Sequence, residues 1–128
     1  MLIVDDSAAV RGAIRQFVED TTRIKVCAEA ENGSEAVQKA KDSDCELVLL
    51  DIGRSYRKGI ETASALRRAL PHLKLVGFSL AVTEFGEELV ASNVFDAVLS
   101  KLDGLTKLVE TLKSLVAATP EPYSSKRS

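Results

Sequence analysis

Short apolar runs alternate along the chain with longer segments in which apolar residues recur every three or four positions. The short runs predict strands and the periodic segments predict helices. Strands are expected over residues 2–4, 24–30, 47–50, 73–78 and 95–99. Helices are expected over residues 8–20, 31–41, 60–70, 84–92 and 105–116, the second opened by an Asn-Gly turn. The pattern therefore alternates five strands with five helices.

This alternation predicts an α/β fold, in which helices cover both faces of a parallel sheet. The run Leu47 to Leu50 shows no polar alternation, which is typical of a central strand buried on both faces. Right-handed crossovers leave few possible topologies. The most economical of these is a flavodoxin-like, doubly wound sheet of five strands in the order 2-1-3-4-5.

The chain has 128 residues, the length of one domain, and 45% of them are hydrophobic. A net charge of -2 gives no support for nucleic-acid binding, and no apolar run is long enough to span a membrane. The first residues reach two aspartates without a basic start, unlike a signal peptide, so a cytoplasmic location is expected. Residues 119–128 are rich in Pro and Ser. We expect a domain over residues 1–118, followed by a flexible tail or linker stub.

Several reactive or charged side chains are expected to have structural roles only. Cys27 and Cys45 lie in apolar surroundings without metal-ligand spacing, and we predict reduced thiols in the core. His72 is expected in a surface turn between a helix and a strand. The pair Arg67-Arg68 is expected on a solvated helix face.

Charged and polar residues follow four of the predicted strands. The strand order reverses between strands 1 and 3, and open α/β sheets bind ligands beyond the carboxyl ends of the strands at such a point. Asp5, Asp6 and Asp51 follow these two strands. Ser79 and Lys101 follow strands 4 and 5 at the same edge. Three adjacent carboxylates favour a divalent cation between them, and Mg²⁺ suits such a site. One carboxylate can then attack a phosphoryl group while the cation and the lysine offset its charge.

Each of these residues also has a plainer interpretation. Asp5 and Asp6 would serve equally as caps of the helix that follows them. Asp51 would serve as a turn residue, Ser79 as an ordinary hydroxyl after a strand, and Lys101 as a solvated side chain. The convergence of all five at one edge favours the metal and phosphoryl site.

The same residues carry a resemblance to a known family. From about Leu2 to Val116 the chain resembles the receiver domain of bacterial two-component response regulators, which has a CheY-like fold. The resemblance rests on five features in order: "LIVDDS", "LVLLDIG", Gly59, "LVGFS" and "VLSK". The segment "KVCAEAENGSEAV" further resembles the receivers that precede helix-turn-helix output domains of the NarL/FixJ type.

The resemblance implies a role for each site residue. Asp51 would accept the phosphoryl group, Ser79 would be the switch hydroxyl, and Lys101 would be the charge clamp. The implied Mg²⁺ ligands are Asp6, Asp51, the backbone carbonyl of Gly53, and Asp5 through water or by orientation.

The implied function is phosphorelay signal transduction. A sensor histidine kinase or phosphotransfer protein would donate the phosphoryl group, and a protein-interaction surface would switch in response. The expected partners are an output domain or a downstream protein, with a homodimer as one option and no direct nucleic-acid or membrane contact. The domain would not be an enzyme beyond its own phosphorylation and slow autodephosphorylation. The sequence leaves open whether it stands alone or precedes an output domain.

Three departures from the family pattern bear on this function. The basic stretch Arg54–Lys58 replaces the usual Met-Pro and is expected to form a loop that either attracts the phosphodonor or faces solvent. Val98 stands where the family often has an aromatic switch residue. Gly53 and Ala81 occupy two positions that often orient the hydrolytic water, and neither has a polar side chain. Slow autodephosphorylation is therefore expected.

Two other functions compete with phosphorelay. A phosphorylation-independent interaction module is favoured by the lost Met-Pro and by Val98, but it has no need for the five retained site residues. A Mg²⁺-dependent phosphohydrolase of the haloacid dehalogenase type needs a second acid two residues after its nucleophile. Gly53 occupies that position, which argues against turnover.

Overall fold

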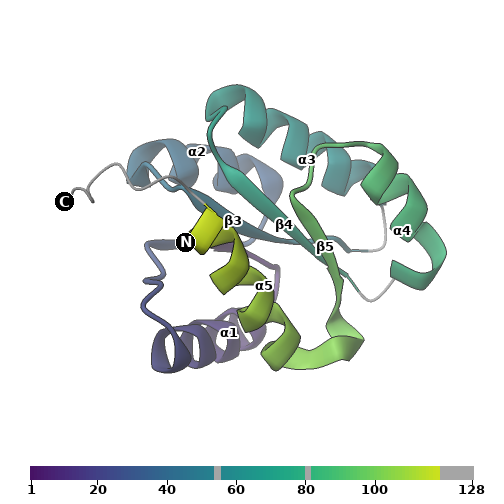
Figure 1. Cartoon of the computed structure of the whole chain (residues 1–128). Helices are drawn as coiled ribbons and strands as arrows, with labels where there is room; N and C mark the ends of the chain where they lie inside the picture. Colours follow the sequence, from purple (N-terminus) through teal and green to yellow (C-terminus); the bar gives the residue numbers. More distant parts are fainter. Residues whose placement is uncertain (54–55, 80–81, 119–128) are drawn as a thin grey trace.

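The structure, a computed structural model, describes residues 1–53, 56–79 and 82–118. Five parallel strands form one sheet in the order β2-β1-β3-β4-β5, which confirms the predicted α/β topology (Figure 1). The strands are β1 (Leu2–Val4), β2 (Ala28–Ala30), β3 (Leu47–Asp51), β4 (Lys74–Ser79) and β5 (Ala97–Ser100). The helices are α1 (Ala8–Thr21), α2 (Gly33–Ser43), α3 (Tyr56–Ala69), α4 (Val82–Ala91), the short 3₁₀ helix η1 (Lys101–Asp103) and α5 (Gly104–Ala118).

The helices divide between the two faces of the sheet. In Figure 1, α1 and α5 lie on one face, and α2 and α3 lie on the other, while α4 lies beside β5. The first face buries apolar side chains from α1 and α5, including Ile14, Val18, Leu108 and Leu112. The second face buries small and apolar side chains from α2 and α3, including Ala36, Ala40, Ala63 and Leu66.

Strand β3 runs through the middle of this core. Leu47 and Leu49 pack against the first face, and Val48 and Leu50 pack against the second. Successive side chains of a strand point to opposite faces, so an unbroken apolar run requires cover on both sides. The sequence prediction of a doubly buried central strand is confirmed, and Asp51 is the last residue of that strand.

Strand β2 is shorter than the predicted range 24–30, and it starts at Ala28. Its partner in the sheet is β1, which begins only at Leu2, so little backbone is available to extend the ladder. The amide of Val26 instead donates to Glu19 Oε2 at 2.9 Å. A side chain of α1 therefore takes over backbone pairing before the strand begins.

Helix α3 begins at Tyr56, four positions before the predicted start at Ile60. Arg57 and Lys58 are thus exposed residues of a helical first turn rather than of a loop, while positions 54 and 55 lie outside the described residues. Gly59 lies inside this helix, at a point where the backbone passes close to the side chain of Ile52. A Cβ at Gly59 would lie 3.0 Å from Ile52 Cγ2, so the close approach leaves little room for a larger side chain.

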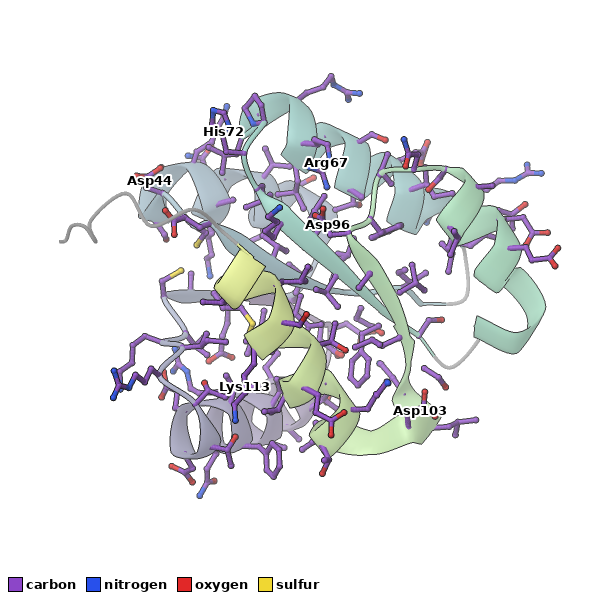
Figure 2. All side chains as sticks on the ribbon, viewed as in Figure 1. Asp44, Arg67, His72, Asp96, Asp103 and Lys113 are labelled. Atoms are coloured by element: carbon purple, nitrogen blue, oxygen red, sulfur yellow. The ribbon has the colours of Figure 1, made fainter. Side chains whose placement is uncertain are left out.

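Arg67 contradicts the predicted solvated face of Arg67-Arg68, although Arg68 is exposed. The Arg67 guanidinium donates to the carbonyl of Val94 at 2.7 Å and to the carbonyl of Leu73 at 3.0 Å. It also pairs with Asp96 at 3.1 Å, and Figure 2 shows the two side chains between α3 and the start of β5. The arginine therefore links α3 to residues 94–96, which directly precede β5.

The prediction that both cysteines belong to the core is half wrong. Cys45 is buried, but Cys27 is exposed, and both are free thiols. Cys27 directly precedes the edge strand β2, where the sheet has no further neighbour to cover it. His72 is exposed in the turn between α3 and β4, as predicted.

Candidate functional site

Three carboxylates meet at the carboxyl edge of the sheet. Asp51 ends β3, and Asp5 and Asp6 follow β1, its neighbour in the sheet. One oxygen from each of the three side chains lies within 4.8 Å of the others. Asp5 is only 4% exposed, whereas Asp6 is exposed. The predicted acidic cluster is therefore present, with one buried member and one that reaches solvent.

Asp5 is fixed by its backbone as well as by its carboxylate. Its amide donates to the carbonyl of Ala30 at 3.0 Å, which continues the pairing of β1 with β2. Its Oδ1 accepts from the amide of Ser7 at 2.9 Å. Ser7 is the N-cap of α1, because its hydroxyl accepts from the amide of Val10. The helix cap is thus Ser7, which leaves Asp5 Oδ2 and the Asp6 carboxylate directed to the site.

Lys101 brings a positive charge into this cluster. Its Nζ lies 2.5 Å from Asp51 Oδ1 and 3.4 Å from Asp5 Oδ2. The ammonium also lies 5.8 Å from the centroid of the Phe78 ring, on β4. A cation over an aromatic face is stabilised by the ring quadrupole. The lysine is therefore held at the acidic cluster by two carboxylates and one ring.

The electrostatics of the site favour added positive charge. Burial raises the pKa of Asp51, and the charges of Asp5 and Asp6 add to this, while the hydrogen bond and charge of Lys101 oppose it. For Lys101, burial by itself lowers the pKa. Its hydrogen bond and charge interaction with Asp51, together with Asp5, outweigh burial and hold the pKa of Lys101 above its usual value. One ammonium is therefore not enough to neutralise three carboxylates.

The donor set fits a hard divalent cation. Its side-chain donors are all carboxylate oxygens, which Mg²⁺ prefers, and the exposed Asp6 leaves room for waters. Gly53 lies two residues beyond Asp51 at the same edge, and it is exposed. A Cβ built on Gly53 meets no atom of the described residues within 4 Å.

Ser79 joins the same edge from the neighbouring strand. It is the last residue of β4, it is fully buried, and it lies in register with Ser100 of β5. Because Ser100 directly precedes Lys101, Ser79 and Lys101 come from the ends of adjacent strands. All five side chains expected at the site, together with Gly53, therefore lie at one edge of the sheet.

Two contributors to the site were missed in the sequence. Arg11 Nη1 donates to the carbonyl of Asp5 at 2.6 Å, and Arg11 Nε pairs with Glu29 at 2.9 Å. Phe78 supplies the ring beneath Lys101. Neither carried a local signal, since an arginine in the first half of an amphipathic helix and an aromatic residue in an apolar strand are both ordinary.

The profile of the response regulator receiver domain matches residues 1–113. The chain belongs to this family. The predicted family is thereby confirmed over nearly all of the described residues. Receivers of this family act in two-component signalling, and this is the general function of the chain.

Two relatives show how the receiver matches longer proteins. Protein-glutamate methylesterase/protein-glutamine glutaminase 1 of Methanosarcina acetivorans is 36% identical over 87 residues, which are 68% of this chain and 25% of the relative. Chemotaxis protein CheY of Halobacterium salinarum is 40% identical over 67 residues, which are 52% of this chain and 54% of the relative. The receiver spans only a quarter of the length of the methylesterase.

Solved structures confirm the fold of the receiver. A LuxR-family response regulator from Aurantimonas has a TM-score of 0.80 at 21% identity, covering 91% of this chain and 83% of that chain. The response regulator domain of Thermotoga maritima CheB has a TM-score of 0.79 at 22% identity, covering 93% and 96%. At these identities the likeness concerns the fold.

Two of the departures from the family pattern are at Val98 and Ala81. Val98 is half-buried in β5, in register with Gly77 of β4. Ala81 lies outside the described residues.

Among the helices that the structure describes, none is both long and apolar enough to cross a membrane.

Proposed function

We propose that this receiver accepts a phosphoryl group on Asp51 from a sensor histidine kinase or a phosphotransfer protein, with Mg²⁺ as cofactor, and thereby switches a protein-interaction surface. The observation that carries the proposal is the contact of Lys101 Nζ with Asp51 Oδ1 inside a cluster of three carboxylates. A binding surface alone has no physical need for this arrangement of buried charge.

The residues of the site divide the chemistry among them. An oxygen of Asp51 attacks phosphorus, the bond from phosphorus to the donor nitrogen breaks, and its electron pair remains on the donor ring. Lys101 offsets the charge on the phosphoryl oxygens, and the hydroxyl of Ser79 donates to one of them afterwards. The Mg²⁺ ion would be held by Asp5, Asp6, Asp51 and the carbonyl of Gly53, and it would supply further charge neutralisation.

The acid cluster makes the metal requirement testable. Asp6→Asn should weaken Mg²⁺ binding by about tenfold or more, because one anionic ligand is lost. Asp20→Asn, an exposed acid at the far end of α1, is the matched control and should leave the affinity unchanged. Calorimetric titration with MgCl₂ measures both. Equal affinities in the two variants would contradict the assignment of Asp6 as a ligand.

The phosphoryl group should be lost slowly. Gly53 and Ala81 have no polar side chain to orient an attacking water, so hydrolysis lacks a positioned nucleophile. The expected lifetime of the phosphorylated protein is minutes or longer. Loss within seconds would contradict this part of the proposal.

One experiment tests the phosphorylation itself. The protein is incubated with MgCl₂ and acetyl phosphate, and its intact mass is measured over time. The proposal expects a gain of one phosphoryl group that Asp51→Asn abolishes. Repeated turnover with release of phosphate would indicate a phosphohydrolase instead.

The second candidate is an interaction module that works without phosphorylation. It is favoured by Val98, since a valine has no aromatic ring to swing inward as a switch. An unmodified mass under the same conditions would support this alternative. In both cases we propose a cytoplasmic receiver with protein partners, an output domain or a homodimer among them, and no direct nucleic-acid contact.

The basic first turn of α3 bears on the choice of donor. Arg57 and Lys58 are exposed, and Arg57 stacks over the Tyr56 ring at 5.9 Å from its centroid. We propose that this turn either steers an acidic donor surface toward Asp51 or simply faces solvent. A phosphotransfer rate that falls with salt, and falls less in Arg57→Gln, would favour steering.

A further inference from the structure

The two cysteines lie at the amino ends of the strands, whereas Asp51 lies at the carboxyl ends. Cys27 directly precedes β2, and Cys45 lies two residues before β3, so both lie where strands begin. Both line one pocket of about 290 Å³. Asp44 also lines this pocket, and Figure 2 shows it on the far side of the molecule from Asp103, which ends η1 close to Lys101.

Cys27 is both held and accessible. Its amide donates to the carbonyl of Met1 at 2.9 Å, which continues the ladder of β2 and β1 by one residue. Its thiol donates to the same carbonyl at 3.4 Å. The residue is nevertheless exposed to solvent.

Cys45 is the buried member of the pair, at 7% exposure. It follows Asp44, which ends α2 in a left-handed conformation with φ of 50°, and its amide donates to the carbonyl of Ala40. Burial raises the pKa of Cys45 to about 12, and the next causes are a hydrogen bond and a charge interaction with the Cys27 thiol. The two cysteines come from different segments, and both line the same pocket.

We propose that Cys27 and Cys45 are a redox modification site that forms an intramolecular disulfide on reaction with hydrogen peroxide. The Cys27 thiolate attacks one peroxide oxygen, the O–O bond breaks, and hydroxide leaves and takes up a proton to form water. Cys27 is then a sulfenic acid. The Cys45 sulfur next attacks the Cys27 sulfur, the S–O bond breaks, and the Cys45 proton leaves with the hydroxyl group as a second water. The two thiols lose two electrons in total, and the peroxide gains them.

The surroundings of the pair set this order of events. Cys27 is exposed and meets the oxidant first, whereas Cys45 stays protonated and shielded from it. The exposed thiol is therefore the one that is oxidised, and the buried thiol is the one that attacks it afterwards.

The disulfide would tie the entry of β2 to the entry of β3. It would close the segment from residue 27 to residue 45, which contains β2 and α2. The disulfide would not cover the proposed phosphorylation site. Asp51 is the last residue of β3 and Lys101 follows β5, so both lie at the carboxyl ends of the strands. Oxidation and phosphorylation therefore concern separate parts of the receiver.

The test treats the reduced protein with a small excess of hydrogen peroxide and measures the intact mass. The expected result is the loss of two hydrogen atoms per chain, reversed by dithiothreitol. Trypsin digestion without reduction should give a linked pair of peptides, residues 26–39 and 42–54. Unchanged mass, higher oxides of Cys27 alone, or disulfide-linked dimers through Cys27 would overturn the proposal.

Three variants sharpen this result. Cys45→Ala should accumulate a Cys27 sulfenic acid that dimedone traps, while Cys27→Ser should resist the same dose of peroxide. Asp51→Asn should form the disulfide as readily as the original chain, which separates this proposal from phosphorylation. Trapping on Cys45 in Cys27→Ser would reverse the proposed order.

Discussion

Lys101 Nζ lies 2.5 Å from Asp51 Oδ1, and the two residues come from neighbouring regions of the sheet edge, after β5 and at the end of β3. Strand β4 separates these two strands in the sheet, so the lysine reaches across the end of β4 to the acid. Its ammonium lies over the Phe78 ring of β4. The pair places a positive charge beside the carboxylate that we propose as nucleophile.

Removal of Lys101 should move the titration of Asp51 to higher pH. The hydrogen bond and charge of Lys101 lower the pKa of Asp51, and they partly offset burial. In Lys101→Met the carboxyl should therefore take up its proton at higher pH than in the original chain. Carbon NMR of labelled aspartate measures the shift, with Lys107→Met on the exposed side of α5 as control. An unchanged Asp51 titration would contradict the role of the lysine.

Asp51→Asn should stabilise the metal-free protein at neutral pH. Because the pKa of Asp51 is raised in the folded state, the folded protein binds this proton more tightly than the unfolded chain does. This proton stabilises the folded protein at pH values below the pKa of Asp51 in the unfolded chain. The stabilisation is lost as the pH rises through the pKa of Asp51 in the folded protein. The melting temperature of the variant should thus exceed that of the original chain at pH 7 and approach it in acid.

Added MgCl₂ serves as the control for that measurement. It should raise the melting temperature of the original chain more than that of Asp51→Asn, since the variant lacks one anionic ligand. A variant that is less stable than the original chain at pH 7 without metal would contradict the burial argument.

Arg67→Ala should destabilise the fold by about 1–3 kcal/mol. The change leaves the carbonyl of Val94 without this donor and leaves the Asp96 carboxylate without its cation. Asp96 keeps its bond from the amide of Leu75, at 2.7 Å, so the loss should be partial. Urea unfolding measures the difference. Arg68→Ala, on the exposed neighbour, should change stability by no more than about 0.5 kcal/mol, and equal effects would contradict the fastening role of Arg67.

Gly77→Ala should destabilise the sheet by about 1–3 kcal/mol. A Cβ at Gly77 would lie 2.6 Å from Ile52 Cδ1 and 3.2 Å from the Phe95 ring, so these side chains would have to shift. Gly12→Ala is the matched control, because its Cβ meets nothing within 4 Å and it lies inside α1. That control should instead gain up to about 1 kcal/mol from helix propensity. Thermal melts compare the two changes.

The sequence by itself determined the order of the strands and the edge at which the site lies. Apolar runs and helical periods are local signals, and the handedness of crossovers then leaves few topologies. Once β1 and β3 are neighbours, Asp5, Asp6 and Asp51 must meet, because the carboxyl ends of parallel strands share one edge. The family resemblance on the same residues is confirmed over residues 1–113.

Only the tertiary structure decided which distant side chains pair. Arg67 with Asp96, Arg11 with Glu29 and Cys27 with Cys45 are each brought together from different segments. Their sequence positions look like a solvated face, an ordinary helix and two separate core thiols. Such pairs depend on how helices pack across the sheet and where an edge strand begins, and neither quantity is carried by local periodicity.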